Sequence, residues 1–147
     1  MGVKNLYKVF IDTGGFIALV DERDSYHQEA RSFYMSIGKS TSLITSLLVI
    51  SETYTWLRYQ TSHDLASRFL NIIEKAEKAG VLRVVLADDD TKNKTHAVLK
   101  NYQDQNLSYT DAASFVILEN MGIQHVFGFD SHFYIINRNL WPNVKRI

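Results

Sequence analysis

The 147-residue chain has no cysteine, a single proline and no surplus of either charge. Without cysteine there can be no disulfide, no zinc–thiolate site and no cysteine nucleophile, and the absence agrees with a reducing compartment. Because Pro142 is the only proline, no proline-rich linker divides the chain. No apolar run approaches the roughly 20 residues that span a membrane. We therefore expect one cytoplasmic domain over residues 1–147, with no membrane contact.

The charges balance, with 16 basic and 16 acidic residues. A protein that binds nucleic acid tightly usually carries a basic surplus, so we expect no large electrostatic contact with nucleic acid. A metal-dependent nuclease is less affected by this balance, because bound cations offset the carboxylates of the site and themselves attract phosphate. The charge balance therefore limits the size of the surface that contacts a nucleic acid, but it does not exclude an enzyme that cleaves a nucleic acid.

Short apolar runs alternate along the chain with longer segments of helical spacing. The runs predict strands at 7–12, 42–46, 81–87 and 124–129. The longer segments predict helices at 16–20, 25–37, 47–59, 62–79, 91–103 and 108–121, the second of them started by a capping box of Ser25 and Gln28. This alternation indicates an α/β fold with a mainly parallel central sheet flanked by helices. In such sheets, ligands bind beyond the carboxyl ends of the strands.

Four acidic residues stand where such a fold can bring them together. Asp12 and Asp130 directly follow the first and last predicted strands, whereas Glu52 and Asp111 lie within predicted helices. Each has an ordinary structural explanation: the strand-end aspartates as turn or cap residues, Glu52 as a solvent-facing side chain, and Asp111 as capping-box partner of Ser108. Their joint placement favours one shared site. Oxygen ligands of this kind suit Mg²⁺ or Mn²⁺.

Four segments carry a family resemblance. They are VFIDT at 9–13, TSLLVISE at 45–52, SYTDAASF at 108–115 and HVFGFDSHF at 125–133. In order and spacing the chain resembles the PIN-domain nucleases over essentially its whole length, and among them the VapC-like toxin ribonucleases of type II toxin–antitoxin systems. The resemblance implies a single PIN domain with a three-layer α/β/α fold. It also implies divalent-metal-dependent hydrolysis of RNA, with Asp12, Glu52, Asp111 and Asp130 as the catalytic and metal-binding residues.

We expect Asp12, Asp111 and Asp130 to bind the principal Mg²⁺ or Mn²⁺ ion, and Glu52 to share that ion or orient the attacking water. Thr13 matches a small polar residue that the family places beside the first acid. The family often has Thr or Ser two positions before the last acid, where this chain has Gly128.

Ser131 is a candidate substitute for that missing hydroxyl. Arg58, Arg68, Lys92 and Lys94 are candidate phosphate contacts. The resemblance further implies a small antitoxin that blocks the acidic cleft, and a homodimer. The apolar helices predicted at 47–59 and 62–79 are candidate interface surfaces.

Other residues suggest competing chemistry. The Asp12-Thr13-Gly14 triplet matches the signature of aspartic proteases, but these enzymes need two such triplets on a mostly β scaffold, and this chain is rich in helices. The five histidines show no zinc-hydrolase spacing, and we expect a surface or packing role for His132. The run 88–90 is expected to be a solvated helix start.

The alternative function is not enzymatic: a PIN-like module that binds RNA or protein without catalytic turnover. Clustered carboxylates argue against it, because they are costly unless they hold a cation.

Overall fold

The computed structural model describes residue 3 and residues 6–144. In this part of the chain a five-stranded sheet has the order β3-β2-β1-β4-β5, and every neighbouring pair is parallel. The strands are β1 (Lys8–Ile11), β2 (Ser42–Ser46), β3 (Leu82–Val85), β4 (His125–Phe127) and β5 (Asn139–Trp141). The prediction of a mainly parallel sheet is confirmed, and β5 is an additional strand that the sequence pattern did not indicate.

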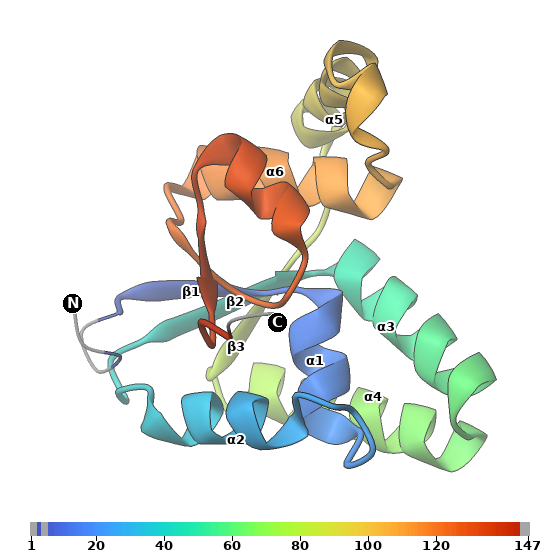
Figure 1. Cartoon of the computed structure of the whole chain (residues 1–147), viewed down its shortest axis with the longest axis vertical. Coiled ribbons are helices and arrows are strands. Elements are labelled where there is room, and N and C mark those ends of the chain that lie inside the picture. Colours follow the sequence, from blue (N-terminus) through green and yellow to red (C-terminus); the bar gives the residue numbers. More distant parts are fainter. Residues whose placement is uncertain (1–2, 4–5, 145–147) are drawn as a thin grey trace.

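Helices cover both faces of this sheet and give three layers, α/β/α (Figure 1). One side carries α1 (Thr13–Val20), α2 (His27–Ser36) and α4 (His63–Lys78), with α3 (Leu47–Gln60) packed against α1 and α4. The other side carries α6 (Tyr109–Met121) and the 3₁₀ helix η3 (Ser131–Ile136). On α6 lies α5 (Asp89–Asn101), joined to it through η2 (Gln103–Gln105). No helix in the described ranges is long and apolar enough to cross a membrane.

Buried phenyl rings join the layers to the sheet. On the α1–α2 side, Phe33 meets the strand residue Phe127 edge to face, with ring centroids 4.9 Å apart. Phe16 of α1 meets Phe69 of α4 in the same way at 5.3 Å. On the other side, Phe115 of α6 packs on Phe133 of η3 at 5.6 Å. These aromatic contacts hold helices from distant parts of the chain over the sheet and so fix the position of its carboxyl edge.

The start of α2 differs from the sequence prediction. The predicted capping box of Ser25 and Gln28 is wrong, because α2 begins at His27 and no side chain caps it. Asp24 instead organises the turn: its carboxylate accepts the Tyr26 N–H at 2.9 Å, and its carbonyl accepts the His27 N–H at 3.0 Å. An aspartate turn therefore takes the place of the serine cap.

The order of the strands determines where a ligand site can form. From β1 the chain proceeds to β2 and β3 on one side, and then returns across β1 to β4 and β5 on the other. The direction reverses between β1 and β4, so the carboxyl ends of these two strands border a crevice. Asp12 directly follows β1, and Asp130 lies shortly after β4. The topology thus brings the first and last acids of the predicted quartet to the same edge of the sheet.

Candidate metal centre

Asp12 is held rigidly at the centre of this crevice and is only 4% exposed. Its N–H donates to the Phe127 carbonyl at 2.9 Å, and its carbonyl accepts the Phe16 N–H at 3.1 Å, so its backbone is tied to both β4 and α1. A Cβ atom at Gly128 would lie 3.0 Å from the Asp12 Cβ and 3.5 Å from its Oδ2. The glycine that departs from the family pattern therefore makes room for the Asp12 carboxylate.

Asp111 belongs to the start of α6. Its Oδ2 accepts the Ser108 N–H at 3.1 Å, and its own N–H donates to Ser108 Oγ at 3.0 Å. This reciprocal pair is the capping box expected from the sequence. The same carboxylate also faces the crevice, where it lies beside Asp130 and His132. The two explanations offered for Asp111, a helix cap and a site residue, are therefore compatible.

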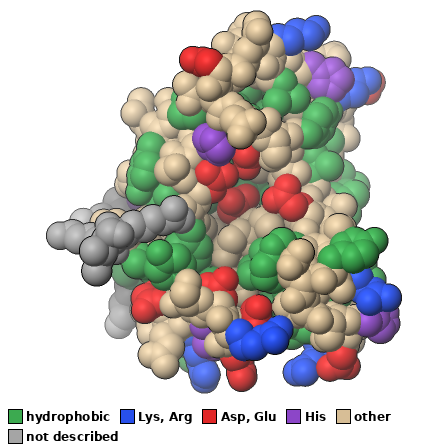
Figure 2. All heavy atoms as spheres, turned by 45° about the vertical axis from the view of Figure 1, so that its right-hand side comes forward, with side chains coloured by type: hydrophobic (Ala, Val, Ile, Leu, Met, Phe, Trp, Pro, Cys, Tyr) green, Lys and Arg blue, Asp and Glu red, His purple; other side chains and the backbone are tan. Residues whose placement is uncertain are grey.

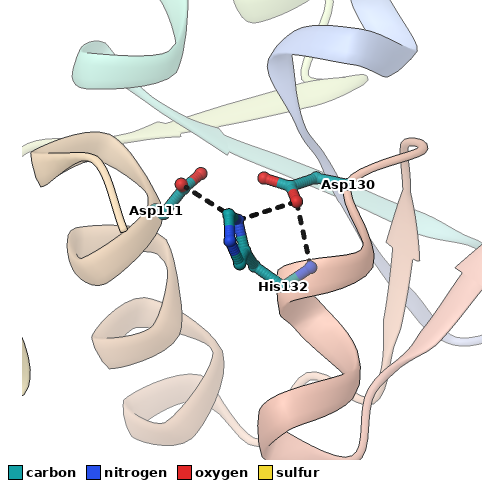
Figure 3. A group of neighbouring side chains, drawn as sticks. All are labelled: Asp111, Asp130 and His132. Atoms are coloured by element: carbon teal, nitrogen blue, oxygen red, sulfur yellow. Dashed lines mark hydrogen bonds and ion pairs between the residues drawn. The ribbon is translucent and has the colours of Figure 1, made fainter. Parts of the chain in front are cut away.

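Asp130 and His132 come together because η3 begins between them. The Asp130 Oδ1 accepts the His132 N–H at 2.9 Å, and the His132 ring turns back toward the acids (Figure 3). Its Nδ1 lies 2.9 Å from Asp130 Oδ1 and 3.6 Å from Asp111 Oδ2; the first contact lacks the direction of a hydrogen bond, and the second is too long for one. One ligand atom from each of the three residues lies within 4.8 Å of the others, a spacing that a metal ion can bridge.

This position for His132 differs from the surface or packing role expected from the sequence. The one sequence signal was its place two residues after Asp130. That spacing brings the two side chains together only where the chain turns sharply, and here η3 supplies that turn.

Glu52 enters the site from α3 and is half-buried. Its charge contributes to the raised pKa of Asp12, so the two carboxylates interact. Glu52 also lines an open groove of about 500 Å³ with Leu48 of its own helix and Thr110 of α6. The structure thus places Glu52 on the side of α3 that faces Asp12 and the start of α6.

The electrostatics of the site disfavour four unpaired carboxylates. The pKa of Asp12 is raised from 3.8 to about 8, chiefly by burial and to a smaller extent by the charges of Asp111, Asp130 and Glu52, while the hydrogen bond from the Thr13 N–H opposes the change. Burial likewise raises the pKa of Asp111, with Asp130 adding to the effect. Each of these shifts favours the neutral acid, because a dry environment and nearby negative charges both disfavour another anion. A divalent cation would remove this cost, and the carboxylate oxygens of the site suit Mg²⁺ or Mn²⁺.

Thr13 and Ser131, the two residues expected to support the acidic side chains, lie in different surroundings. Thr13 is buried, and its Oγ1 has no hydrogen-bond partner among the described residues. An unsatisfied hydroxyl beside Asp12 is a further polar atom available to a bound ion or its water shell. Ser131 is exposed and lines a separate cavity of about 230 Å³ next to the site. Its role as a substitute hydroxyl stays a prediction.

The acidic run 88–90 lies at the start of α5, as expected. Asp88 accepts the Thr91 N–H at 2.8 Å, and its hydrogen bonds with Thr91 lower its pKa. Lys92 and Lys94, two of the candidate phosphate contacts, form surface ion pairs with Asp89 and Asp90 at 3.6 and 3.1 Å. The run is a solvated helix start.

Acidic side chains gather around a hollow on one face of the molecule, with a histidine above them and hydrophobic side chains on either side (Figure 2).

Comparison with known proteins shows a match to the PIN domain over residues 9–139. The chain belongs to the PIN-domain family. It is 30% identical over 139 residues to a VapC ribonuclease of Archaeoglobus fulgidus, covering 91% of this chain and 85% of that protein. It is 29% identical over 125 residues to VapC20 of Mycobacterium tuberculosis, a 23S rRNA-specific endonuclease, covering 85% and 91% respectively.

Solved structures of PIN relatives share the fold. The crystal structure of Mycobacterium tuberculosis VapC20, described as a Sarcin-Ricin loop cleaving toxin, superimposes with a TM-score of 0.79 at 28% identity over 88% of this chain and 95% of that one. VapBC2 from Rickettsia felis, bound to a DNA fragment from its promoter, gives a TM-score of 0.61 at 11% identity, over 90% and 96%. These matches confirm the PIN-like fold and the likeness to VapC ribonucleases. The parallel α/β architecture is not the mostly β scaffold of aspartic proteases.

Proposed function

We propose that this protein is a divalent-metal-dependent endoribonuclease of the VapC toxin type, acting in the cytoplasm. The observation that carries the proposal is the buried Asp12, whose pKa is raised to about 8 at the crevice where Glu52, Asp111 and Asp130 add negative charge. A PIN fold that keeps four interacting carboxylates at the carboxyl edge of its sheet is built to bind a cation there.

In this proposal Asp12, Asp111 and Asp130 hold Mg²⁺ or Mn²⁺, and Glu52 shares the ion or orients the attacking water. A bound divalent ion supplies a more acidic attacking water and neutralises charge at the scissile phosphate. Asp12 would hold the ion as the ionised carboxylate, and the Ser108 cap keeps the Asp111 carboxylate directed into the crevice. Thr13 and Ser131 are assigned supporting positions beside the ligands.

The proposed substrate is a short exposed segment of RNA. Two observations support this choice: the balanced net charge suits a small contact, and the relative VapC20 is a 23S rRNA-specific endonuclease. A ribosomal RNA hairpin of the sarcin–ricin type is therefore the first substrate to test.

The proposed partners are a small antitoxin and a second copy of the chain. An apolar groove of about 380 Å³ between α2 and α4 has Met35 and Ile72 exposed on its rim, a surface suited to an amphipathic partner segment. On α3, Trp56 and Tyr59 are also exposed and could pack in a homodimer. Light scattering of the pure chain, alone and co-expressed with any small protein encoded beside it, tests both partners.

Cleavage assays separate this proposal from a binding module without turnover. The wild-type protein should cleave RNA with Mg²⁺ or Mn²⁺ and stop when EDTA is added. Asp12→Asn and Asp130→Asn should each lower the rate more than about 100-fold, because changes that only reorient metal ligands already cost 10–100-fold. Asp64→Asn, a change at an exposed aspartate on α4, is the matched control and should keep full activity. RNA binding that persists in EDTA without any cleavage would favour the module instead.

A further inference from the structure

A cavity of about 230 Å³ lies directly beside the acidic crevice. Six of the residues that line it are Tyr26, Gly128, Phe129, Ser131, Tyr134 and Asn143. Two of these connect it to the metal centre: Gly128 abuts the Asp12 carboxylate, and Ser131 follows Asp130 in the chain. A nucleotide whose phosphate reaches the carboxylates would therefore have this cavity next to it.

Aromatic rings form the walls of the cavity. Tyr26 and Phe129 are stacked, with ring centroids 4.7 Å apart and planes 14° from parallel. Tyr134, from η3, is 55% exposed at the cavity and leaves its ring accessible to a ligand. Flat aromatic surfaces of this kind stack with the faces of nucleobases whatever the base.

The chemistry of the lining selects among possible occupants. None of the described lining residues carries a charge, so the cavity offers nothing to pair with a phosphate group. The Ser131 hydroxyl and the Asn143 amide add neutral hydrogen-bonding groups at exposed positions. Aromatic walls with neutral donors and acceptors at the rim match a nucleobase, which has apolar faces and a polar edge.

We propose that this cavity holds the base of a nucleotide adjoining the phosphodiester at the metal centre, and that it selects where the RNA is cut. The inference rests on the proposed ribonuclease function and adds to it a specific subsite. Tyr134 is the principal stacking residue. Asn143, in this assignment, contacts the edge of the base.

The test combines a change in the protein with a change in the RNA. After the cleavage site is mapped, substrates are made with an abasic ribose at each flanking nucleotide in turn. One abasic position should raise KM for the wild-type protein about 10-fold, the loss expected when one stacked base is removed. Tyr134→Ala should raise KM for the natural RNA by a similar factor and leave kcat nearly unchanged.

The decisive comparison is between Tyr134→Ala and the abasic RNA together. If the base stacks on Tyr134, the variant and the abasic substrate remove the same contact, so their effects on KM do not multiply. Tyr134→Phe should restore the wild-type KM because it keeps the ring. Tyr7→Ala, an exposed tyrosine just before the amino end of β1, is the matched control and should behave as the wild type. Effects that multiply, or a Tyr134→Ala variant with unchanged KM, would overturn the subsite.

Failure of the subsite and failure of the proposed function give different results. If the wild-type protein does not cleave RNA with any divalent ion, the ribonuclease proposal fails. In that case the cavity is tested by fluorescence anisotropy with the sarcin–ricin hairpin RNA and with a set of the same hairpin that carries one abasic ribose at each loop position in turn. A 10-fold weaker Kd for Tyr134→Ala on natural RNA alone would support the subsite, and equal Kd values would refute it.

Discussion

Replacing Asp12 with asparagine changes the charge of the site while keeping the shape of the side chain. In the metal-free protein, Asp12 is buried and its pKa is raised from 3.8 to about 8. Since the unfolded chain exposes this carboxyl to water, its pKa there returns to the ordinary value. The folded protein thus binds the Asp12 proton more tightly than the unfolded chain does. The stability contributed by this proton is complete below about pH 4 and is lost as the pH rises to about 8.

The size of the effect follows from the shift. One pH unit within this window changes the free energy of unfolding by about 1.36 kcal/mol for a single group. Without metal, the wild-type protein should therefore lose about 3 kcal/mol relative to Asp12→Asn between pH 5 and pH 7. Asparagine does not titrate, so the difference between the two proteins isolates Asp12 from the other groups that ionise in this range.

Urea unfolding in EDTA at pH 5, 6 and 7 measures this difference directly. Asp12→Asn should become progressively more stable than the wild type as the pH rises. Asp64→Asn, at an exposed surface ion pair, should show a nearly constant offset below about 1 kcal/mol. A wild-type minus Asp12→Asn difference that stays the same across these pH values would refute the electrostatic description of the site.

Three further substitutions test how the backbone supports the site. Gly15→Ala would drive its Cβ into the Phe127 carbonyl oxygen, and we expect a loss of about 3 kcal/mol in urea unfolding. Gly128→Ala would place a methyl group 3.0 Å from the Asp12 Cβ. It should weaken Mn²⁺ binding about 10-fold by calorimetry, because displacing a ligand by a few tenths of an ångström misaligns it. Ser108→Ala removes one half of the α6 cap and should cost about 1 kcal/mol in thermal unfolding.

Sequence patterns predicted the main architecture because most elements depend on local chemistry. The strand ending at Ile11 is a short apolar run, and the helix of residues 63–78 has clear apolar spacing and a serine cap. Strand β5 has no such signal, since it has only three residues and is held by pairing with β4, where Val126 faces Leu140. Tertiary contacts, not local preference, make Asn139–Trp141 a strand.

The site was predictable in part for the same reason. Asp12 and Asp130 could be placed because strand ends gather at one edge of a parallel sheet. Asp111 was ambiguous because a helix cap and a ligand both require an acid at that position, and the structure uses it as a cap that faces the crevice. The position of His132 beside Asp130 could not be predicted from the sequence, because it depends on the turn made by η3.

Calorimetric titration of Mn²⁺ into the metal-free protein tests the central claim most directly. We predict that the wild type and Asp64→Asn bind Mn²⁺ with the same affinity, whereas Asp12→Asn and Asp130→Asn bind at least about 10-fold more weakly. The wild type should also release protons on binding near neutral pH, since Asp12 must ionise to bind the ion. Equal Mn²⁺ affinities for the wild type, Asp12→Asn and Asp130→Asn would contradict the assignment of these carboxylates to one metal centre.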